Sequence, residues 1–222
     1  MLEDSMKHKK QLAIFINHPQ CSLQSTNGII ESLQSRYRFK LFSKYPVDSG
    51  FFDNVDMIII PGGLGDSDTF SKVLENHRDS VRKFVASGGK YLGICMGAYW
   101  AGHHYFNILD GIRPVQYIRR PNTDTNRPHA KAQRITWLGK KRTMFFYDGC
   151  SLIGPGLDKS DIWATYPNGD AMALIQNNIG LIGCHPESQE DWYETYSWMK
   201  DHWHHGQDHK LLLKFVNAMF GQ

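Results

Sequence analysis

In the first hundred residues, short apolar runs alternate with longer amphipathic stretches, and this alternation limits the fold more than any other feature of the sequence. The runs have the length of strands, and the stretches between them carry apolar residues at helical spacing. Such alternation is typical of strand-helix-strand units, which build a mostly parallel sheet covered by helices on both faces. The expected strands are 12–16, 39–42, 55–60 and 91–94, and the expected helices are 25–37, 70–86 and one from about residue 95.

The second half of the chain is less regular. Residues 115–133 are polar and contain Pro121 and Pro128, so they predict a long excursion on the surface. Short strand-like runs separated by Gly, Asn or Pro turns then indicate antiparallel hairpins added to the parallel sheet. These strands are expected at 134–138, 143–147, 164–166, 171–175 and 179–184, and helices at 188–204 and 209–220. With no repeat or linker, we expect a single domain over residues 1–222, its first ten or so residues flexible.

Charge and composition exclude several classes of function. The 25 Lys and Arg residues exceed the 22 Asp and Glu residues by only three and are scattered, which argues against nucleic-acid binding. No apolar run approaches the roughly 20 residues of a membrane span, and no secretory segment follows the charged start, so we expect a cytoplasmic protein without membrane contact. The four cysteines form no C-x-x-C pair and predict neither a disulfide framework nor a zinc ribbon. We expect no cofactor, and self-association is left open.

The sharpest motif is Gly93-Ile94-Cys95-Met96-Gly97, at the junction of an apolar strand and a helix. It has the form of a nucleophile elbow, G-x-S-x-G, with sulfur in place of oxygen. The glycines are required because the turn is tight, and the helix N-terminus favours the thiolate. Taken alone, the motif fits a buried structural cysteine in a Gly-rich turn equally well.

A second motif favours catalysis. An apolar strand ends in His185-Pro186-Glu187. Because strand residues alternate between faces, His185 and Glu187 point the same way, and Glu187 could hold the imidazole with its free nitrogen toward the thiol. Alone, His-Pro-Glu is an ordinary strand-to-helix turn, but together with the elbow it predicts a Cys-His-Glu triad.

A third motif, Pro61-Gly62-Gly63, ends an Ile-rich strand. In a parallel sheet this end lies at the same edge as Cys95, where ligands bind to open sheets. The backbone amide of Gly62 or Gly63, together with that of Met96, could form an oxyanion hole. By itself Pro-Gly-Gly is a plain turn, and only its place in the chain gives it this interpretation.

Together these segments resemble the class I glutamine amidotransferase-like superfamily. The similarity rests on IPGG at 60–63, GKYLGICMGAY at 89–99 and GCHPE at 183–187. More narrowly, the chain is similar to the amidotransferase-like N-terminal domain of eukaryotic-type biotin-protein ligases, which also fits FFYDGC at 145–150 and ATYPNG at 164–169. The resemblance implies a flavodoxin-like three-layer sandwich and a triad carried by Cys95, His185 and Glu187.

Two departures limit what the resemblance implies. Glutamine-hydrolysing members carry a Gln four residues after the nucleophile, and here that residue is Tyr99. The chain also lacks a Gly-Arg-Gly-Arg loop and a synthetase domain. We therefore expect neither a glutaminase nor a biotin ligase.

Two classes of function remain. The first is a cysteine hydrolase or amidase acting on a small-molecule or peptide amide or ester: Cys95 attacks, His185 moves the proton and Glu187 orients His185. The second is a non-catalytic binding, regulatory or redox-sensing module that keeps the fold and uses Cys95 as a ligand contact or sensor. A third, simpler interpretation is a structural subunit with an inert Cys95.

Other residues are weaker candidates. Asn17, Ser22 and Ser25 follow the first strand and Tyr99 follows the elbow, so we expect Asn17, Ser22 and Tyr99 in the substrate pocket, with helix capping as the alternative for the serines. We interpret His202, His205 and His209 as a solvated face rather than a metal site. The aromatic residues Trp192, Tyr193, Tyr196 and Trp198 are expected to pack against the sheet or to form a dimer contact. Tyr147, Asp148 and Cys150 are also expected near the site. Cys21, Cys150 and Cys184 have no assigned role.

Overall fold

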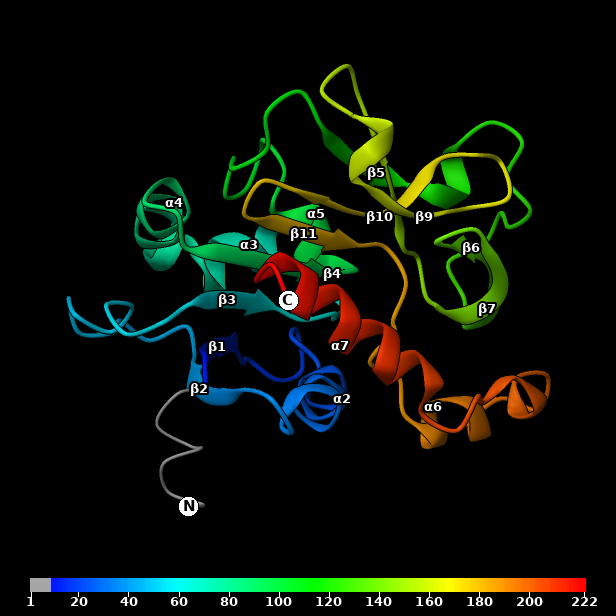
Figure 1. Ribbon diagram of the computed structural model, residues 1–222, viewed down its shortest axis with the longest axis horizontal. Coiled ribbons are helices and arrows are strands. Elements are labelled where there is room, and N and C mark those ends of the chain that lie inside the picture. Colours follow the sequence, from blue (N-terminus) through cyan, green and yellow to red (C-terminus); the bar gives the residue numbers. More distant parts are fainter. Residues whose placement is uncertain (1–8) are drawn as a thin grey trace.

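A computed structural model describes residues 9–222 and shows one mixed sheet. Within these residues the sheet has eleven strands, nine of which form a continuous path (Figure 1). Its parallel half runs in the order β2 (Arg38–Phe42), β1 (Gln11–Phe15), β3 (Met57–Ile60), β4 (Lys90–Ile94) and β11 (Ile179–Ile182). Its antiparallel half continues with β10 (Ala171–Gln176), β9 (Ile162–Thr165), β6 (Lys131–Trp137) and β7 (Lys140–Phe146). The expected α/β fold with appended antiparallel strands is confirmed.

Helices cover both faces of the parallel half. Helices α2 (Leu23–Leu33) and α7 (Gln207–Met219) contact each other on one face (Figure 1), and α3 (Ser67–Val73), α4 (Arg78–Ala86) and α5 (Met96–Trp100) lie on the other. Because side chains alternate along β1, Leu12 and Ile14 pack in the core under α2 and α7, and Ala13 and Phe15 pack in the core under α3, α4 and α5. Each fully buried Leu, Ile or Phe stabilises this arrangement by about 1.5–3 kcal/mol.

Two expected helices are shorter than predicted. The stretch 70–86 is divided into α3 and α4 by the 3₁₀ turn Glu75–His77, where the ring of His77 hydrogen-bonds the Ser43 carbonyl at 2.7 Å. The stretch 188–204 contains only the five-residue α6 (Glu190–Glu194) and a 3₁₀ turn. Its residues Trp192, Tyr193, Tyr196 and Trp203 pack together with Phe145 of β7 in a separate small cluster.

The excursion expected at 115–133 is partly wrong, because its first residues belong to the sheet. Strand β5 (Arg113–Gln116) pairs with β8 (Cys150–Ile153), and neither strand was predicted. Beyond β5, the buried Tyr117 stacks on Tyr166 with ring centroids 3.8 Å apart and donates a hydrogen bond to Asp124 at 2.7 Å. This side of the segment is therefore anchored to the core.

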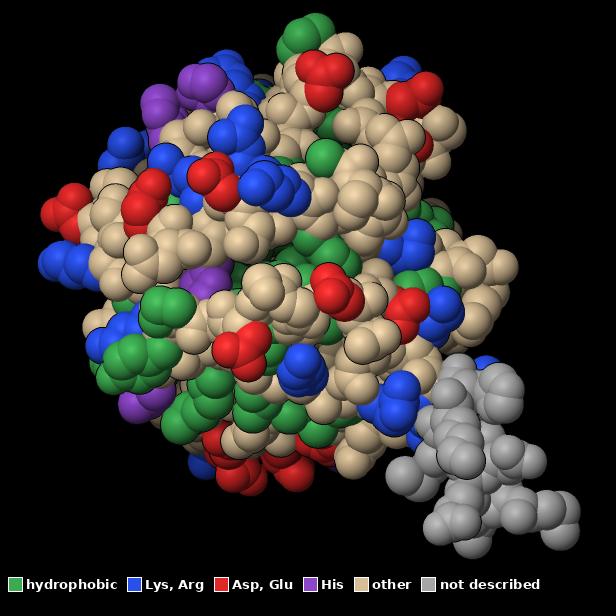
Figure 2. Space-filling view, turned by 90° about the vertical axis from the view of Figure 1, so that its left-hand side faces the viewer, with side chains coloured by type: hydrophobic (Ala, Val, Ile, Leu, Met, Phe, Trp, Pro, Cys, Tyr) green, Lys and Arg blue, Asp and Glu red, His purple; other side chains and the backbone are tan. Residues whose placement is uncertain are grey.

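Three further findings concern the surface and the termini. No helix within residues 9–222 combines the length and apolar character needed to cross a membrane. The flexibility expected at the start of the chain falls mainly on residues 1–8, outside the described part. On the face shown in Figure 2, basic and acidic side chains are interspersed.

Candidate active site

Cys95 lies at the carboxyl end of β4 in a strained conformation. Its backbone angles are φ 49° and ψ −106°, which non-glycine residues adopt rarely and at a cost of about 1–3 kcal/mol. A Cβ atom at Gly93 would collide with the Gly97 carbonyl, and one at Gly97 would collide with the Ile60 carbonyl. The two glycines are thus required by close backbone contacts, as the motif predicts.

The thiol is almost covered. Cys95 is 4% exposed, and its Sγ lies 3.5 Å from the Tyr147 carbonyl oxygen, to which the thiol donates. Helix α5, which begins at Met96, has only five residues, so the helix dipole supports a thiolate less than the sequence suggested.

His185 and Glu187 reach the same sheet edge because β11 is the parallel neighbour of β4. The Cys95 amide donates to the Ile182 carbonyl at 2.8 Å, which fixes the two strand ends relative to each other. His185 Nδ1 donates to Glu187 Oε1 at 2.9 Å, and Glu187 is fully buried. Nε2 is therefore the imidazole nitrogen left for the thiol.

The protonation of His185 is biased toward the imidazolium. Burial by itself lowers the pKa of His185, but the negative charges of Cys95 and Glu187 and hydrogen bonds to both side chains raise the pKa to about 10. The arrangement favours a thiolate-imidazolium pair.

Ser25, in the first turn of α2, holds Glu187 from the other side. Its hydroxyl donates to Glu187 Oε1 at 2.6 Å and accepts a hydrogen bond from the Gly62 amide at 3.0 Å. Helix α2 comes this close because Gly28 has no side chain, and a Cβ there would collide with the Glu187 carbonyl. The sequence predicts Ser25 at the start of a helix, as a pocket residue or a cap, and no local signal predicts its bond to Glu187.

The oxyanion-hole prediction needs one correction. The Gly62 amide already donates to Ser25, so Gly62 is not an available donor in this arrangement. Within residues 9–222, the amides of Gly63 and Met96 make no hydrogen bond to the protein. Gly63 and Met96 thus remain the candidate donors.

A pocket of about 350 Å³ opens beside His185, and neither Cys95 nor Met96 is among its lining residues. Ser22 lines the pocket and also caps α2, accepting a hydrogen bond from the Ser25 amide at 3.3 Å. Asn17 and Tyr99 do not line it, which corrects their assignment: Asn17 bonds Gln20 at 3.0 Å, and Tyr99 donates to the Asp148 carbonyl at 3.1 Å. The sequence does not predict three further residues that line the pocket, which belong to the aromatic segment after Glu187: Trp192, Thr195 and Tyr196.

Of the three histidines expected on a solvated face, His205 is exposed and His202 is half-buried, but the half-buried ring of His209 hydrogen-bonds the Ser188 carbonyl at 2.9 Å. In the described part of the chain, no three His, Cys, Asp or Glu side chains are grouped as a metal site would require.

Comparison with solved structures identifies the architecture. The PurLQS structure from Thermotoga maritima is 14% identical, with 95% of this chain and 99% of that chain covered and a TM-score of 0.62. A glutamine amidotransferase from the same organism is 11% identical, with 96% and 97% covered and a TM-score of 0.64. The chain has the glutamine amidotransferase fold. A glutamine amidotransferase from Methylobacillus flagellatus is 14% identical over 87% of this chain and 76% of that chain, with a TM-score of 0.57.

Sequence comparison supports the narrower resemblance. Residues 19–110 match the family model for the N-terminal region of biotin-protein ligase. The matched segment includes Ser25, Gly63 and Cys95 and ends before His185 and Glu187. No curated protein matches the chain by sequence. The amidotransferase fold and the similarity to the biotin-protein ligase N-terminal region are therefore established, and the chemistry is argued from the site.

Proposed function

We propose that the chain is a cysteine hydrolase or amidase in which Cys95 is the nucleophile, His185 the general base and acid, and Glu187 the group that orients His185. The observation that carries the proposal is the buried His185–Glu187 hydrogen bond of 2.9 Å at the same sheet edge as the strained Cys95. A structural cysteine needs neither an oriented imidazole nor a positive φ angle.

The reaction proceeds by acyl transfer through the thiol. Cys95 Sγ, deprotonated by His185, attacks the carbonyl carbon, and the amides of Gly63 and Met96 stabilise the resulting oxyanion. The bond to the leaving group then breaks, and the imidazolium of His185 protonates the departing amine or alcohol. Water, deprotonated by His185, attacks the thioester, releases a carboxylic acid and regenerates the thiol.

Neither glutamine hydrolysis nor biotin ligation is part of this proposal. The position of the substrate-binding glutamine of glutamine-hydrolysing relatives is occupied by Tyr99, whose hydroxyl is bonded to the Asp148 carbonyl. The chain carries no Gly-Arg-Gly-Arg sequence.

Mass spectrometry of the protein treated with p-nitrophenyl acetate tests the mechanism. An acetyl group should appear on the Cys95 peptide at about one per chain, disappear as turnover proceeds, and be absent from Cys95→Ala. A stable adduct that never turns over would favour the regulatory or redox-sensing alternative. Turnover that survives in Cys95→Ala would exclude the proposed nucleophile.

A further inference from the structure

Aromatic side chains form the walls of the pocket beside His185. Phe145 lies at the end of β7 and Trp192 in α6, and their ring centroids are 5.1 Å apart with planes at 79°. The Trp192 ring also lies 5.4 Å from the His185 ring, so the aromatic wall begins next to the proposed base. Tyr147 and Tyr196 complete this wall.

Apart from His185, which pairs with Glu187, the same pocket has no charged side chain with which to hold a charged substrate. Among the described residues that line it there is no Asp, Glu, Lys or Arg, and its polar side-chain groups are hydroxyls, the Gln24 amide, the Trp192 indole N–H and two histidines. His185 is engaged with Glu187, which leaves His18 at the exposed rim. An amino-acid substrate carries an ammonium and a carboxylate, and their desolvation here would find no compensating partner.

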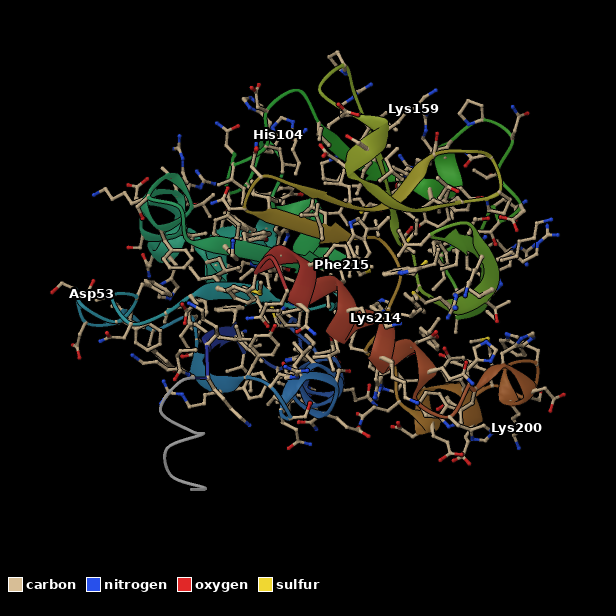
Figure 3. All side chains as sticks on the ribbon, viewed as in Figure 1. Asp53, His104, Lys159, Lys200, Lys214 and Phe215 are labelled. Carbon is tan, nitrogen blue, oxygen red and sulfur yellow. The ribbon has the colours of Figure 1, made fainter. Side chains whose placement is uncertain are left out.

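A neutral lining is not a general property of this surface. A wider hollow of about 860 Å³, at the amino ends of β1, β3 and β4, is lined by three lysines and three aspartates, namely Lys10, Lys83, Lys90, Asp48, Asp53 and Asp56. Figure 3 places Asp53 of that hollow at one end of the long axis and Lys200, which follows α6, at the other. Charged side chains thus line the hollow at the amino ends of β1, β3 and β4, and Asp, Glu, Lys and Arg are absent from the described lining of the pocket beside His185.

We infer that the acyl group accepted by this site is uncharged and carries an aromatic or other flat apolar body, as in an arylacetyl amide or ester. The inference rests on the proposed function and deepens it. The pocket volume of about 350 Å³ lies at the lower end of the range for small-molecule sites, which suits one ring and a short acyl linker. Cys95 forms the thioester to this acyl group, His185 protonates the leaving amine or alcohol, and water releases the aryl acid.

The test compares two anilides with the same leaving group. Phenylacetyl-p-nitroanilide presents a neutral aryl acyl group, and L-glutamic acid γ-(p-nitroanilide) presents a charged one. We expect kcat/KM for the phenylacetyl compound to be higher by about 10-fold or more, the range over which an apolar pocket discriminates. Equal rates, or preference for the γ-glutamyl compound, would overturn the inference.

Variants show whether the aromatic wall causes the preference. Trp192→Ala and, independently, Tyr196→Ala should lower the ratio of phenylacetyl to acetyl turnover, measured with p-nitrophenyl phenylacetate and p-nitrophenyl acetate. Tyr45→Ala, at a 69% exposed residue outside the pocket, is the matched control and should leave the ratio unchanged. A ratio unaffected by both wall variants contradicts the inference.

A binding measurement separates this inference from the mechanism. Titration of Cys95→Ala with phenylacetamide, followed by calorimetry, should give saturable binding, whereas glutamine should give none at the same concentrations. If phenylacetamide binds but wild-type protein hydrolyses nothing, the inferred ligand class stands as a binding preference and the proposed function fails. If the acetyl ester is turned over through Cys95 but phenylacetamide does not bind, the function stands and the substrate class is wrong.

Discussion

The hydroxyl of Ser25 donates to Glu187 Oε1 at 2.6 Å, so the carboxylate that orients His185 is itself held by a residue of α2. Oε1 thereby accepts from both Ser25 and His185, while within residues 9–222 Oε2 has no hydrogen-bond partner. Both donors act on one oxygen of a fully buried group, and loss of either leaves the charge less compensated. We interpret Ser25 as a positioning residue that acts through Glu187.

Replacement of Ser25 tests this interpretation. Ser25→Ala should reduce the free energy of unfolding by about 1.5–3 kcal/mol, the usual value for a hydrogen bond to a buried charged group. It should also slow alkylation of Cys95 by iodoacetamide at pH 7, because a less fixed Glu187 orients His185 less well. Chemical denaturation and intact-mass kinetics measure the two effects.

Ser32→Ala is the matched control. Ser32 lies in the same helix and is also buried, but its hydroxyl donates only to the Gly28 carbonyl, at 2.7 Å. This variant should change the unfolding free energy and leave the alkylation rate as in wild type. Equal alkylation rates in the two variants would mean that Ser25 is structural only.

A second prediction concerns pH and His185. Because the pKa of His185 is raised to about 10, the imidazolium persists through the neutral range and stabilises the Cys95 thiolate. At pH 7, His185→Ala should alkylate at Cys95 about 10-fold more slowly, since about 1.4 kcal/mol of ion-pair interaction changes the thiolate population tenfold. The difference in alkylation rate between wild type and His185→Ala should become smaller toward pH 10, where the wild-type imidazolium loses its proton.

The pH profile of alkylation, measured by mass spectrometry from pH 5 to 10, checks this prediction. Glu187→Gln keeps the size of the side chain and removes one of the charges that raise the pKa of His185, so its profile should fall between wild type and His185→Ala. Superimposable profiles for all three proteins would show that no thiolate-imidazolium pair exists.

Local stereochemistry made part of the site predictable from sequence. The elbow requires glycines at fixed distances from Cys95, and His185 and Glu187 are hydrogen-bonded two residues apart, so both signals are contained in a few consecutive residues. Strand alternation is not what aligns His185 with Glu187, because β11 ends at Ile182 and both residues follow it. The Ser25–Glu187 bond joins residues 162 positions apart, and only the packing of α2 creates it. Likewise the periodicity of 188–204 indicates helix but gives no reason for Trp192 to turn toward the pocket.

A third prediction concerns the selectivity of thiol modification. All four cysteines are free, but Cys21, Cys150 and Cys184 are completely buried, and burial raises the pKa of each. Native protein should therefore react with iodoacetamide at Cys95 alone, and at the other three only after unfolding. Peptide mapping after a short reaction at pH 7 distinguishes the sites, and modification of Cys184 before Cys95 would contradict the assignment.

A fourth prediction follows from Asp208, which is 2% exposed at the start of α7. Burial raises the pKa of Asp208 to about 6, and the positive charges of Arg142, 3.6 Å away, and His209 offset this only in part. Because the pKa of Asp208 in the folded protein lies above the ordinary aspartate value of 3.8, the folded protein binds more protons between pH 3.8 and pH 6, and its stability falls as the pH rises through this range. Asp208→Asn removes this titration, so the variant should gain stability relative to wild type as the pH rises. The free energy of unfolding of the variant minus that of wild type should be larger at pH 7 than at pH 4 by about 1–3 kcal/mol. Urea denaturation at both pH values measures this difference. Asp201→Asn, at an exposed residue, is the control. If Asp208→Asn has the same stability relative to wild type at both pH values, the assignment to Asp208 is wrong.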